Sequence, residues 1–455
     1  MQSLKATIIL GLFFLFSLVS LALFFNLEDK ADFSSLASRS TDAAKKKGKS
    51  GLREFEKSEV ISKQDKVENE PSALFNDPAI KQAWGLKKSD AARAWKVTHG
   101  SKNVVVAVID TGIDINHEDI KSNLWKNPGE TGLDKNGKDK AKNGIDDDKN
   151  GYVDDVYGWN FVASSNDLTD NHGHGTHIAG IIGAEAGNQK GISGISPEVS
   201  LMIIKYYDPK VTNTDNLKNT INSINYAIKM GAQIINYSGG GTDYSQEEFE
   251  AVKKAEKNGI LFVAAAGNER SNSDQFHYYP ADYKLTNIIS VTAMDPSKDV
   301  LSTSNFGTET VDIAAPGQNI ISTLPGNSYG FMTGTSQATA FVTGAAVLVK
   351  ANKPDFKFDD IKKYILSTGD ASPTLALKTR TSRSLNLFKA LTILDQGMSA
   401  NGVMVSGPVH DEFSTTTKGN RELTQNPFGK SLMEAVQKSN TPTKRLGDKK
   451  DNQIQ

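Results

Sequence analysis

Three of the seven histidines in the chain lie within one short segment, NHGHGTHIAG, which holds His172, His174 and His177. Imidazole rings bind metals or move protons near neutral pH. The cluster therefore predicts a metal centre, a site of acid–base chemistry, or ordinary loop residues. A zinc site is disfavoured, because the chain has no cysteine and no carboxylate stands at ligand spacing from these rings.

Ser336 and Asp110 are of the types that would give one histidine a catalytic role. Ser336 lies in MTGTSQATAFVTGAAVLVKAN, so its hydroxyl is expected at a helix N-terminus beside free backbone N–H groups. Capping is the commoner role of a serine there. A serine becomes a nucleophile when a base lies beside it and a carboxylate orients that base. His174, in the glycine-rich turn before THIAGIIGA, is the candidate base, and Asp110, ending VVVAVID, is the candidate carboxylate.

Asn268, in the segment AAAGNE, provides a fourth chemical group. Its side-chain amide can donate to a developing oxyanion together with the backbone N–H of Ser336. Each residue alone is a moderate signal, whereas all of them together indicate acyl-transfer chemistry at a serine. His177 is then expected to be structural, and His172 either lines the site or faces water.

Short β-branched runs could position these residues. Near-continuous apolar runs of this length are typical of parallel strands that are covered on both faces. The runs are residues 104–110, 201–207, 232–238, 260–267 and 287–293. Asp110, Ser238 and Asn268 end or follow such runs, and ligands of open α/β sheets bind beyond the carboxyl ends of the strands.

Helical patterns alternate with these runs. Residues 216–231 place Leu217, Ile221, Ile224 and Ile228 on one face before a terminal glycine, and residues 245–259 start with serine and early acids and end with glycine. Repeated βα units imply right-handed crossovers. The sequence therefore predicts an α/β fold with a doubly wound, mainly parallel sheet and helices on both faces.

Composition excludes several classes of function. The 455 residues carry 52 Lys and Arg against 53 Asp and Glu, a formal net charge of −1, so nothing draws the whole chain to nucleic acid. The absence of cysteine excludes a disulfide framework, a cysteine nucleophile and a thiolate metal site.

The two ends of the chain differ from its middle. Residues 1–25 form a signal peptide or a membrane anchor, because about twenty apolar residues exceed the usual core of a signal peptide and match the span of a bilayer. Either alternative predicts an exported protein, with membrane contact only if the segment is retained. Residues 26–73 are predicted to be a polar pro-segment or tether, residues 74–397 the folded domain, and residues 398–455 a polar, disordered tail.

Four blocks of the sequence resemble the signatures of the subtilisin-like serine proteases. They are VAVIDTGIDINHEDI, HGTHIAG, AAAGNE and STLPGNSYGFMTGTSQA, and they occur in the family's order of Asp, His and Ser. The resemblance covers about residues 74–395. It implies a subtilisin-like fold and hydrolysis of extended polypeptides by an endopeptidase through an acyl-enzyme. It also implies that Asp110 orients the base His174, that Ser336 is the nucleophile and that Asn268 is the oxyanion donor.

The same resemblance implies where a substrate binds. Ser238, Gly239 and Gly240 of NYSGGG would pair with an extended peptide as an added strand. Ala265 and Gly267 would form the other wall of the primary specificity pocket. Because these residues are small, an open pocket for bulky apolar side chains is expected, and Glu269 could also admit a basic one.

Acidic residues predict structural calcium, and no organic cofactor is expected. In GIDDDKNGYVDDVYGWNF, side chains and one carbonyl follow the order of an EF-hand loop, although Tyr157 replaces the usual final glutamate. The ligands would be Asp146, Asp148, Asn150, the Tyr152 carbonyl and Asp154. A solvated acidic loop is the alternative. The family resemblance implies a second ion at Asp77 and Asp119, near the loop 186–192.

Two other functions remain open. One is a catalytically silent binding or scaffold protein on the same fold, because a fold alone does not give a function. The other is a serine esterase, although Thr335 and Ala338 do not match the G-x-S-x-G elbow around Ser336.

Overall fold

The computed structural model describes residues 76–393. The segments predicted for residues 1–25, 26–73 and 398–455 lie outside the described residues. Within the described part, no helix is both long and apolar enough to cross a membrane.

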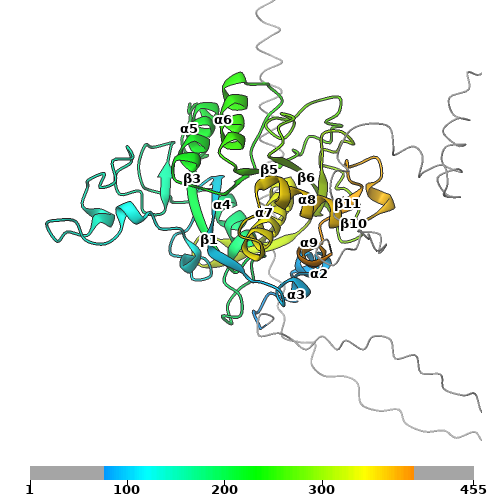
Figure 1. Cartoon of the computed structure of the whole chain (residues 1–455), viewed down its shortest axis with the longest axis horizontal. Coiled ribbons are helices and arrows are strands. Elements are labelled where there is room, and N and C mark those ends of the chain that lie inside the picture. The colour runs from blue at the N-terminus through cyan, green and yellow to red at the C-terminus, as the bar shows by residue number, and fades with distance from the viewer. Residues whose placement is uncertain (1–75, 394–455) are drawn as a thin grey trace, which may run out of the picture. The chain divides into compact units, whose positions relative to one another are not determined.

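A nine-stranded sheet forms the centre of the described region (Figure 1). Its strands run in the order β10-β11-β7-β6-β5-β4-β1-β3-β2, and all neighbours are parallel except β10 and β11. The strands are β1 (Gly100–Asp110), β2 (Gly158–Asn160), β3 (Glu198–Lys205), β4 (Ile234–Tyr237), β5 (Leu261–Ala265), β6 (Ile288–Met294), β7 (Ile313–Pro316), β10 (Asp370–Ala371) and β11 (Arg383–Ser384). A separate hairpin pairs β8 (Ile320–Leu324) with β9 (Ser328–Met332).

Helices cover both faces of the sheet, so the predicted doubly wound α/β fold is confirmed. On one face α5 (Asn216–Lys229) and α6 (Gln246–Lys257) pack against one apolar cluster. The other cluster contains residues of the remaining helices. These are α2 (Trp84–Lys88), α3 (Ala91–Ala94), α4 (His174–Gly183), α7 (Thr335–Asn352), α8 (Phe358–Thr368) and α9 (Leu387–Thr392).

Strand β1 shows why the runs are apolar throughout. Its residues alternate between the two clusters, with Val106 and Val108 on the α7 face and Ala107 and Ile109 on the α5 face, and all four are fully buried. Successive side chains of a strand point to opposite faces, so a doubly covered strand has no polar face.

One detail of the predicted α5 face is wrong. Leu217 is 41% exposed, whereas Ile224 is fully buried. Ile221 and Ile228 also pack against the apolar cluster that contains Ile224, so only Leu217 departs from the predicted face, because α5 packs on the sheet around its middle rather than at its first turn. The helix ends as expected, since Gly231 follows it with a φ of 77°.

Helix α7 occupies the centre of its face. It contacts strands β1, β4, β5, β6 and β7 and also packs against α4. Nearly all of its residues are buried, and Thr343 donates a hydrogen bond of 2.8 Å to Asn236 in β4. This helix therefore fixes the position of Ser336 relative to the strand ends.

Candidate active site

The strand ends meet at one edge of the sheet. Asp110 is the last residue of β1, and Ser238 directly follows β4, the parallel neighbour of β1. Asn268 follows β5, the next strand along. The two helices α4 and α7 start at this edge with His174 and Thr335. The structure thus gathers the predicted residues from segments that are far apart in sequence.

Asp110 and His174 are in direct hydrogen-bond contact. The Nδ1 atom of His174 lies 2.7 Å from Asp110 Oδ1, which also accepts the backbone N–H of Thr111 at 2.8 Å. Burial alone would lower the pKa of His174, but the charge and hydrogen bond of Asp110, aided by the charge of Asp170, raise it above 6.5. The carboxylate therefore leaves Nε2 as the ring nitrogen available for chemistry.

Asp170 organises the turn that leads into α4, and the sequence analysis missed it. Its Oδ1 accepts the Thr111 hydroxyl and the Gly173 N–H, both at 2.8 Å, and its Oδ2 accepts the Thr176 N–H at 2.9 Å. Thr111 in turn accepts the N–H of Gly175 at 2.9 Å. Free N–H groups at the start of α4 are thus satisfied by a buried carboxylate four residues before His174.

A buried ion pair holds the same turn from the other side. Lys205, the last residue of β3, lies 2.7 Å from Asp208 and donates to the Thr169 carbonyl at 2.5 Å. Asp208 also accepts from Asn171 at 2.8 Å. The side chains of Lys205 and Asp208 are only 3% and 6% exposed. The segment before His174 is therefore tied to β3, the strand beside β1.

Ser336 occupies the second position of α7. Its N–H has no partner within the helix, as is general for the first turn. The hydroxyl donates to the Ser238 carbonyl at 3.4 Å. In the described part of the chain no hydrogen bond joins this hydroxyl to His174, and such bonds are often long before substrate binds.

Asn268 is oriented by the residue before Ser336. Its Oδ1 accepts the N–H of Thr335 at 3.0 Å and the Thr335 hydroxyl at 3.2 Å. Asn268 is exposed, and its Nδ2 group takes no part in the contacts with Thr335, so this group can donate to a bound substrate. The Nδ2 group and the Ser336 N–H thus belong to residues that are fixed together, as a paired oxyanion donor requires.

The other two clustered histidines differ from His174. His177 is fully buried in α4, and its Nε2 lies 3.0 Å from the Ile320 carbonyl. Burial, together with the charge of His174, lowers the pKa of His177 to about 4, which fits a neutral structural ring. His172 is exposed, and its ring centroid lies 6.0 Å from that of His174 in an edge arrangement.

The predicted substrate-binding residues lie on two neighbouring segments. Ser238, Gly239 and Gly240 follow β4, while Ala265 ends β5 and Gly267 comes two residues later. Gly267 has a φ of 100°, a conformation that favours glycine. Glu269 accepts a hydrogen bond of 2.7 Å from Asn305. Tyr278, which no sequence pattern indicated, has its ring against both Gly240 and Gly267.

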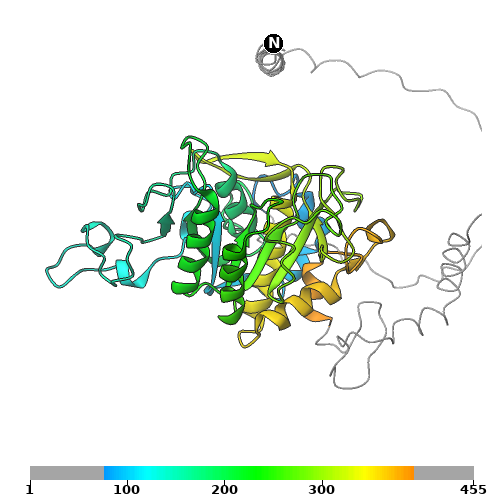
Figure 2. The same ribbon diagram turned by 90° about the horizontal axis from the view of Figure 1, so that it is seen from above.

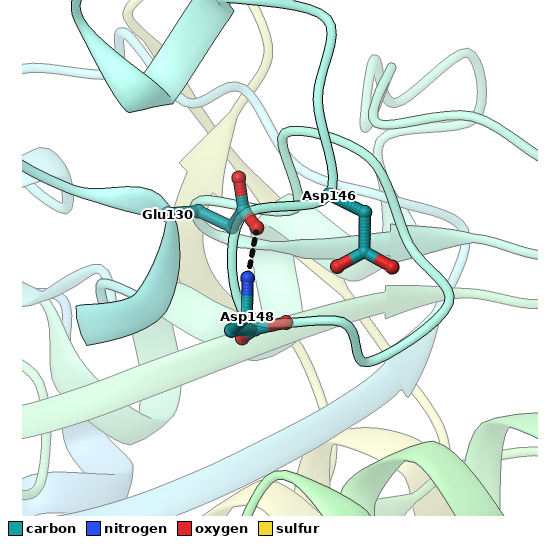
Figure 3. A group of neighbouring side chains, drawn as sticks. All are labelled: Glu130, Asp146 and Asp148. Atoms are coloured by element: carbon teal, nitrogen blue, oxygen red, sulfur yellow. Dashed lines mark hydrogen bonds between the residues drawn. The ribbon is translucent and has the colours of Figure 1, made fainter. Parts of the chain in front are cut away.

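The acidic loop between β1 and β2 gathers three carboxylates, one of them unforeseen (Figure 3). Oxygens of Glu130, Asp146 and Asp148 lie within 4.8 Å of one another. Glu130 is fully buried, its Oε2 has no hydrogen-bond partner, and burial raises its pKa. A buried carboxylate oxygen without a donor is an oxygen ligand that a cation would satisfy.

The other residues predicted for this loop make internal contacts. Asn150 donates its N–H to Asp146 at 3.0 Å, and its Oδ1 accepts the N–H of Tyr152 at 2.7 Å. Asp154 accepts the N–H of Gly144 at 3.1 Å. Of the predicted carboxylate ligands, Asp154 is not a member of the three-carboxylate group. Figures 1 and 2 show this segment (cyan) extending away from the sheet.

Asp77 and Asp119 meet around the loop 186–192. Asp77 accepts the N–H groups of Gly187 and Gln189 at 2.9 and 3.1 Å, and Asp119 accepts from Asn188 at 2.7 Å. Asp77 is 2% exposed and Asp119 is fully buried. Burial raises the pKa of Asp119 to about 6, with the charge of Asp77 acting in the same direction. Two neighbouring buried carboxylates repel one another, and a cation between them would offset that repulsion.

The comparisons with known proteins agree with this geometry. The subtilase family profile matches residues 101–418. The major intracellular serine protease of Bacillus subtilis is 38% identical over 269 residues, covering 59% of this chain and 74% of that protein. Subtilisin DY of Bacillus licheniformis is 34% identical over 286 residues, covering 63% and 90%. A solved protease structure from Pseudoalteromonas arctica PAMC 21717 matches the fold with a TM-score of 0.56 and 23% identity, covering 70% of this chain and 98% of that one.

The chain belongs to the subtilase family. It is a subtilisin-like serine endopeptidase, and proteins that it resembles carry that activity in their names. The predicted resemblance, fold and enzyme class are therefore confirmed.

Proposed function

We propose that the protein hydrolyses peptide bonds of extended polypeptides through an acyl-enzyme formed on Ser336, with His174 as base and Asp110 as its orienting carboxylate. The observation that carries this assignment is the 2.7 Å contact between Asp110 and His174 at the same sheet edge as the start of α7. A carboxylate bound to Nδ1 holds the tautomer in which Nε2 can accept a proton.

The reaction follows from these positions. His174 Nε2 removes the proton of the Ser336 hydroxyl as its oxygen attacks the scissile carbonyl carbon. The resulting imidazolium is stabilised by Asp110 and gives the proton to the leaving amine as the C–N bond breaks. Water then attacks the acyl ester by the same proton path and frees Ser336.

Negative charge on the carbonyl oxygen is met by two donors. We assign them to Asn268 Nδ2 and the Ser336 N–H, because the Thr335 contacts hold the Asn268 amide beside the nucleophile. The Asn268→Ala variant should lower kcat by about 10²–10³ with little change in KM, a magnitude that was measured on a subtilisin. Steady-state kinetics on a peptide substrate test this, and an unchanged kcat would contradict the role.

The substrate is expected to bind as a strand beside Ser238, Gly239 and Gly240. These residues continue β4 beyond the sheet edge, next to the hydroxyl of Ser336. Strand addition uses backbone hydrogen bonds, so it tolerates many sequences and leaves selectivity to the side-chain pockets.

Labelling with a serine-directed phosphonate tests the whole assignment. The wild-type protein should be labelled at Ser336 and should cleave casein, while Ser336→Ala should lose both properties and keep the wild-type melting temperature. Labelling of Ser336→Ala at wild-type level would refute the nucleophile. Hydrolysis of a simple ester without hydrolysis of casein would instead favour an esterase.

We also propose that calcium binds at two places. One site would use Glu130, Asp146 and Asp148, which each offer an oxygen within 4.8 Å of the others, and Glu130 also has a buried oxygen without a donor. The second would use Asp77 and Asp119 beside the loop 186–192. A cation there would offset carboxylate repulsion and stabilise the fold, with no part in the bond-breaking steps.

Export is a further part of the proposal. The support for it is the apolar segment at residues 1–25, which is followed by a polar stretch up to residue 73. N-terminal sequencing of the protein recovered from culture medium and from membranes tests it. Recovery only from the cytoplasm would contradict export, and a membrane-bound species that starts at Met1 would identify an anchor.

A further inference from the structure

The space between Gly240 and Gly267 is filled by the ring of Tyr278. A Cβ atom built on Gly240 would lie 2.5 Å from Cε1 of this ring, and one built on Gly267 would lie 2.9 Å from Cδ2. These two ring atoms are on opposite sides of the six-membered ring. Tyr278 therefore spans the distance between the segment after β4 and the segment after β5.

Backbone contacts hold Tyr278 in this place. Its N–H donates to Asp282 Oδ2 at 2.8 Å. The next residue, Tyr279, exchanges two backbone hydrogen bonds with Gly241 at 2.7 and 2.9 Å. The ring of Tyr279 also stacks on Tyr283, with the centroids 4.8 Å apart. The segment that carries Tyr278 is thus attached to Gly241, the residue that follows one of the two glycines its ring contacts.

Polar side chains also lie against Gly267. The Asn305 Nδ2 atom would lie 2.5 Å from a Cβ on Gly267, and it donates to the Ala266 carbonyl at 2.8 Å. The same nitrogen donates to Glu269, whose Oε2 also lies against Gly267. The wall beyond β5 is therefore closely packed as well.

We propose that Tyr278 closes the deep end of the primary specificity pocket, so that the protease prefers substrates with a small side chain at the residue whose carbonyl is attacked. This inference rests on the proposed function, because the two glycine segments define the pocket only if the substrate binds beside Ser238. It replaces the expectation of bulky apolar side chains, which considered only the small residues of the two walls.

The physical reason is exclusion by occupied space. An aromatic or long aliphatic substrate side chain would have to enter the gap between the two segments, where the Tyr278 ring already lies. A methyl group or a hydrogen needs no such space. Steric rejection of this kind gives selectivity without added attraction for the preferred substrate.

The test uses the full-length protease and four chromogenic peptides that differ only at the residue before the cleaved amide: Ala, Leu, Phe or Lys. The wild-type kcat/KM should be at least about tenfold higher for Ala than for Phe, since a few carbon atoms in a pocket change this ratio by about 10–200-fold. Tyr278→Gly should raise kcat/KM for Phe by about tenfold or more and so lower the Ala-to-Phe ratio. Tyr278→Phe is the matched control, because it keeps the ring and should keep the wild-type preference.

The wild-type ratio decides the question even where Tyr278→Gly fails to fold. Wild-type preference for Phe, Leu or Lys would overturn the inference, as would an unchanged Ala-to-Phe ratio in an active Tyr278→Gly variant. These outcomes leave the proposed function intact as long as Ser336 reacts with the phosphonate. Failure of the wild type to cleave any peptide, together with no labelling, would refute the proposed function itself.

Discussion

The Asp110 carboxylate contacts Nδ1 of His174, and this contact sets both the orientation of the imidazole ring and the direction of its pKa shift. Asp110 Oδ1 is itself fixed by the N–H of Thr111, so ring and carboxylate behave as one unit. Because a base must be neutral to accept a proton, a raised pKa moves the onset of activity to higher pH.

The Asp110→Asn variant should show this in its pH profile. In the wild type the acidic limb of kcat/KM should have its midpoint above 6.5, because the pKa of His174 is raised. Removal of the carboxylate charge should lower that pKa and move the midpoint to lower pH. It should also reduce kcat by about 10⁴ by favouring the wrong tautomer. An unchanged midpoint in this variant would contradict the pairing.

The positions of the proposed catalytic residues could be predicted from sequence, because the ends of apolar strands and of helices are readable in it. Asp110, His174, Asn268 and Ser336 all lie at such ends. Glu130 and Tyr278 could not be predicted this way. Their importance depends on contacts with residues that are 10 or more positions away, which no local pattern records.

Among the elements, strand β3 and the turn before α4 are coupled by a buried ion pair. The hydrogen bonds of Asp208 to Lys205 and Asn171 oppose the effect of burial and lower the pKa of Asp208 to about 2. The folded state therefore favours the ionised carboxylate. The ionised Asp208 carboxylate contributes about 2 kcal/mol to the free energy of unfolding. This contribution is fully present above about pH 4 and is lost as the pH falls through about 2.

Replacement of Asp208 by Asn tests this coupling. The buried Lys205 would lose the carboxylate that lies 2.7 Å from its Nζ atom, so the free energy of unfolding should fall by about 3 kcal/mol or more. Urea unfolding at pH 7 measures the loss. The exposed Asp243→Asn is the matched control and should change stability by less than about 0.5 kcal/mol. Equal effects of the two substitutions would show that the ion pair does not hold the turn.

The element boundaries were predictable to within a few residues where the runs were apolar. Strands β1, β4, β5 and β6 overlap the predicted runs, and α6 begins after its Ser245 cap as expected. The buried face of α5 was not predictable in detail. Which of its turns touches the sheet depends on the crossing between helix and strands, and Leu217 is apolar without being buried.

At the scale of the whole molecule, bound cations should take the place of the missing disulfides. A ligand that binds only the folded state stabilises it by about 2.7 kcal/mol at one hundred times its Kd. We therefore expect calcium to raise the melting temperature of the wild type and a chelator to lower it.

The Glu130→Gln variant isolates the contribution of the acidic loop, because its effect on stability should differ without and with calcium. In chelator the variant should be as stable as the wild type or more so, because it removes a buried negative charge whose Oε2 atom has no donor and keeps an oxygen that can accept the Asp147 N–H. With calcium it should gain less stability than the wild type. Calorimetry at several calcium concentrations measures both. Glu309→Gln, at an exposed carboxylate, should respond as the wild type does, and parallel calcium curves for all three proteins would exclude a cation at Glu130.

The central position of α7 has a consequence for the life of the chain before it is complete. Asp110 and His174 are synthesised more than 150 residues before Ser336, and α7 must then insert against five strands that are already made. A nascent polypeptide, still attached to the ribosome, thus lacks both the proposed nucleophile and the helix that positions it. Self-digestion through Ser336 would have to wait until α7 has been synthesised and packed, so the order of the chain itself would delay the onset of proteolysis.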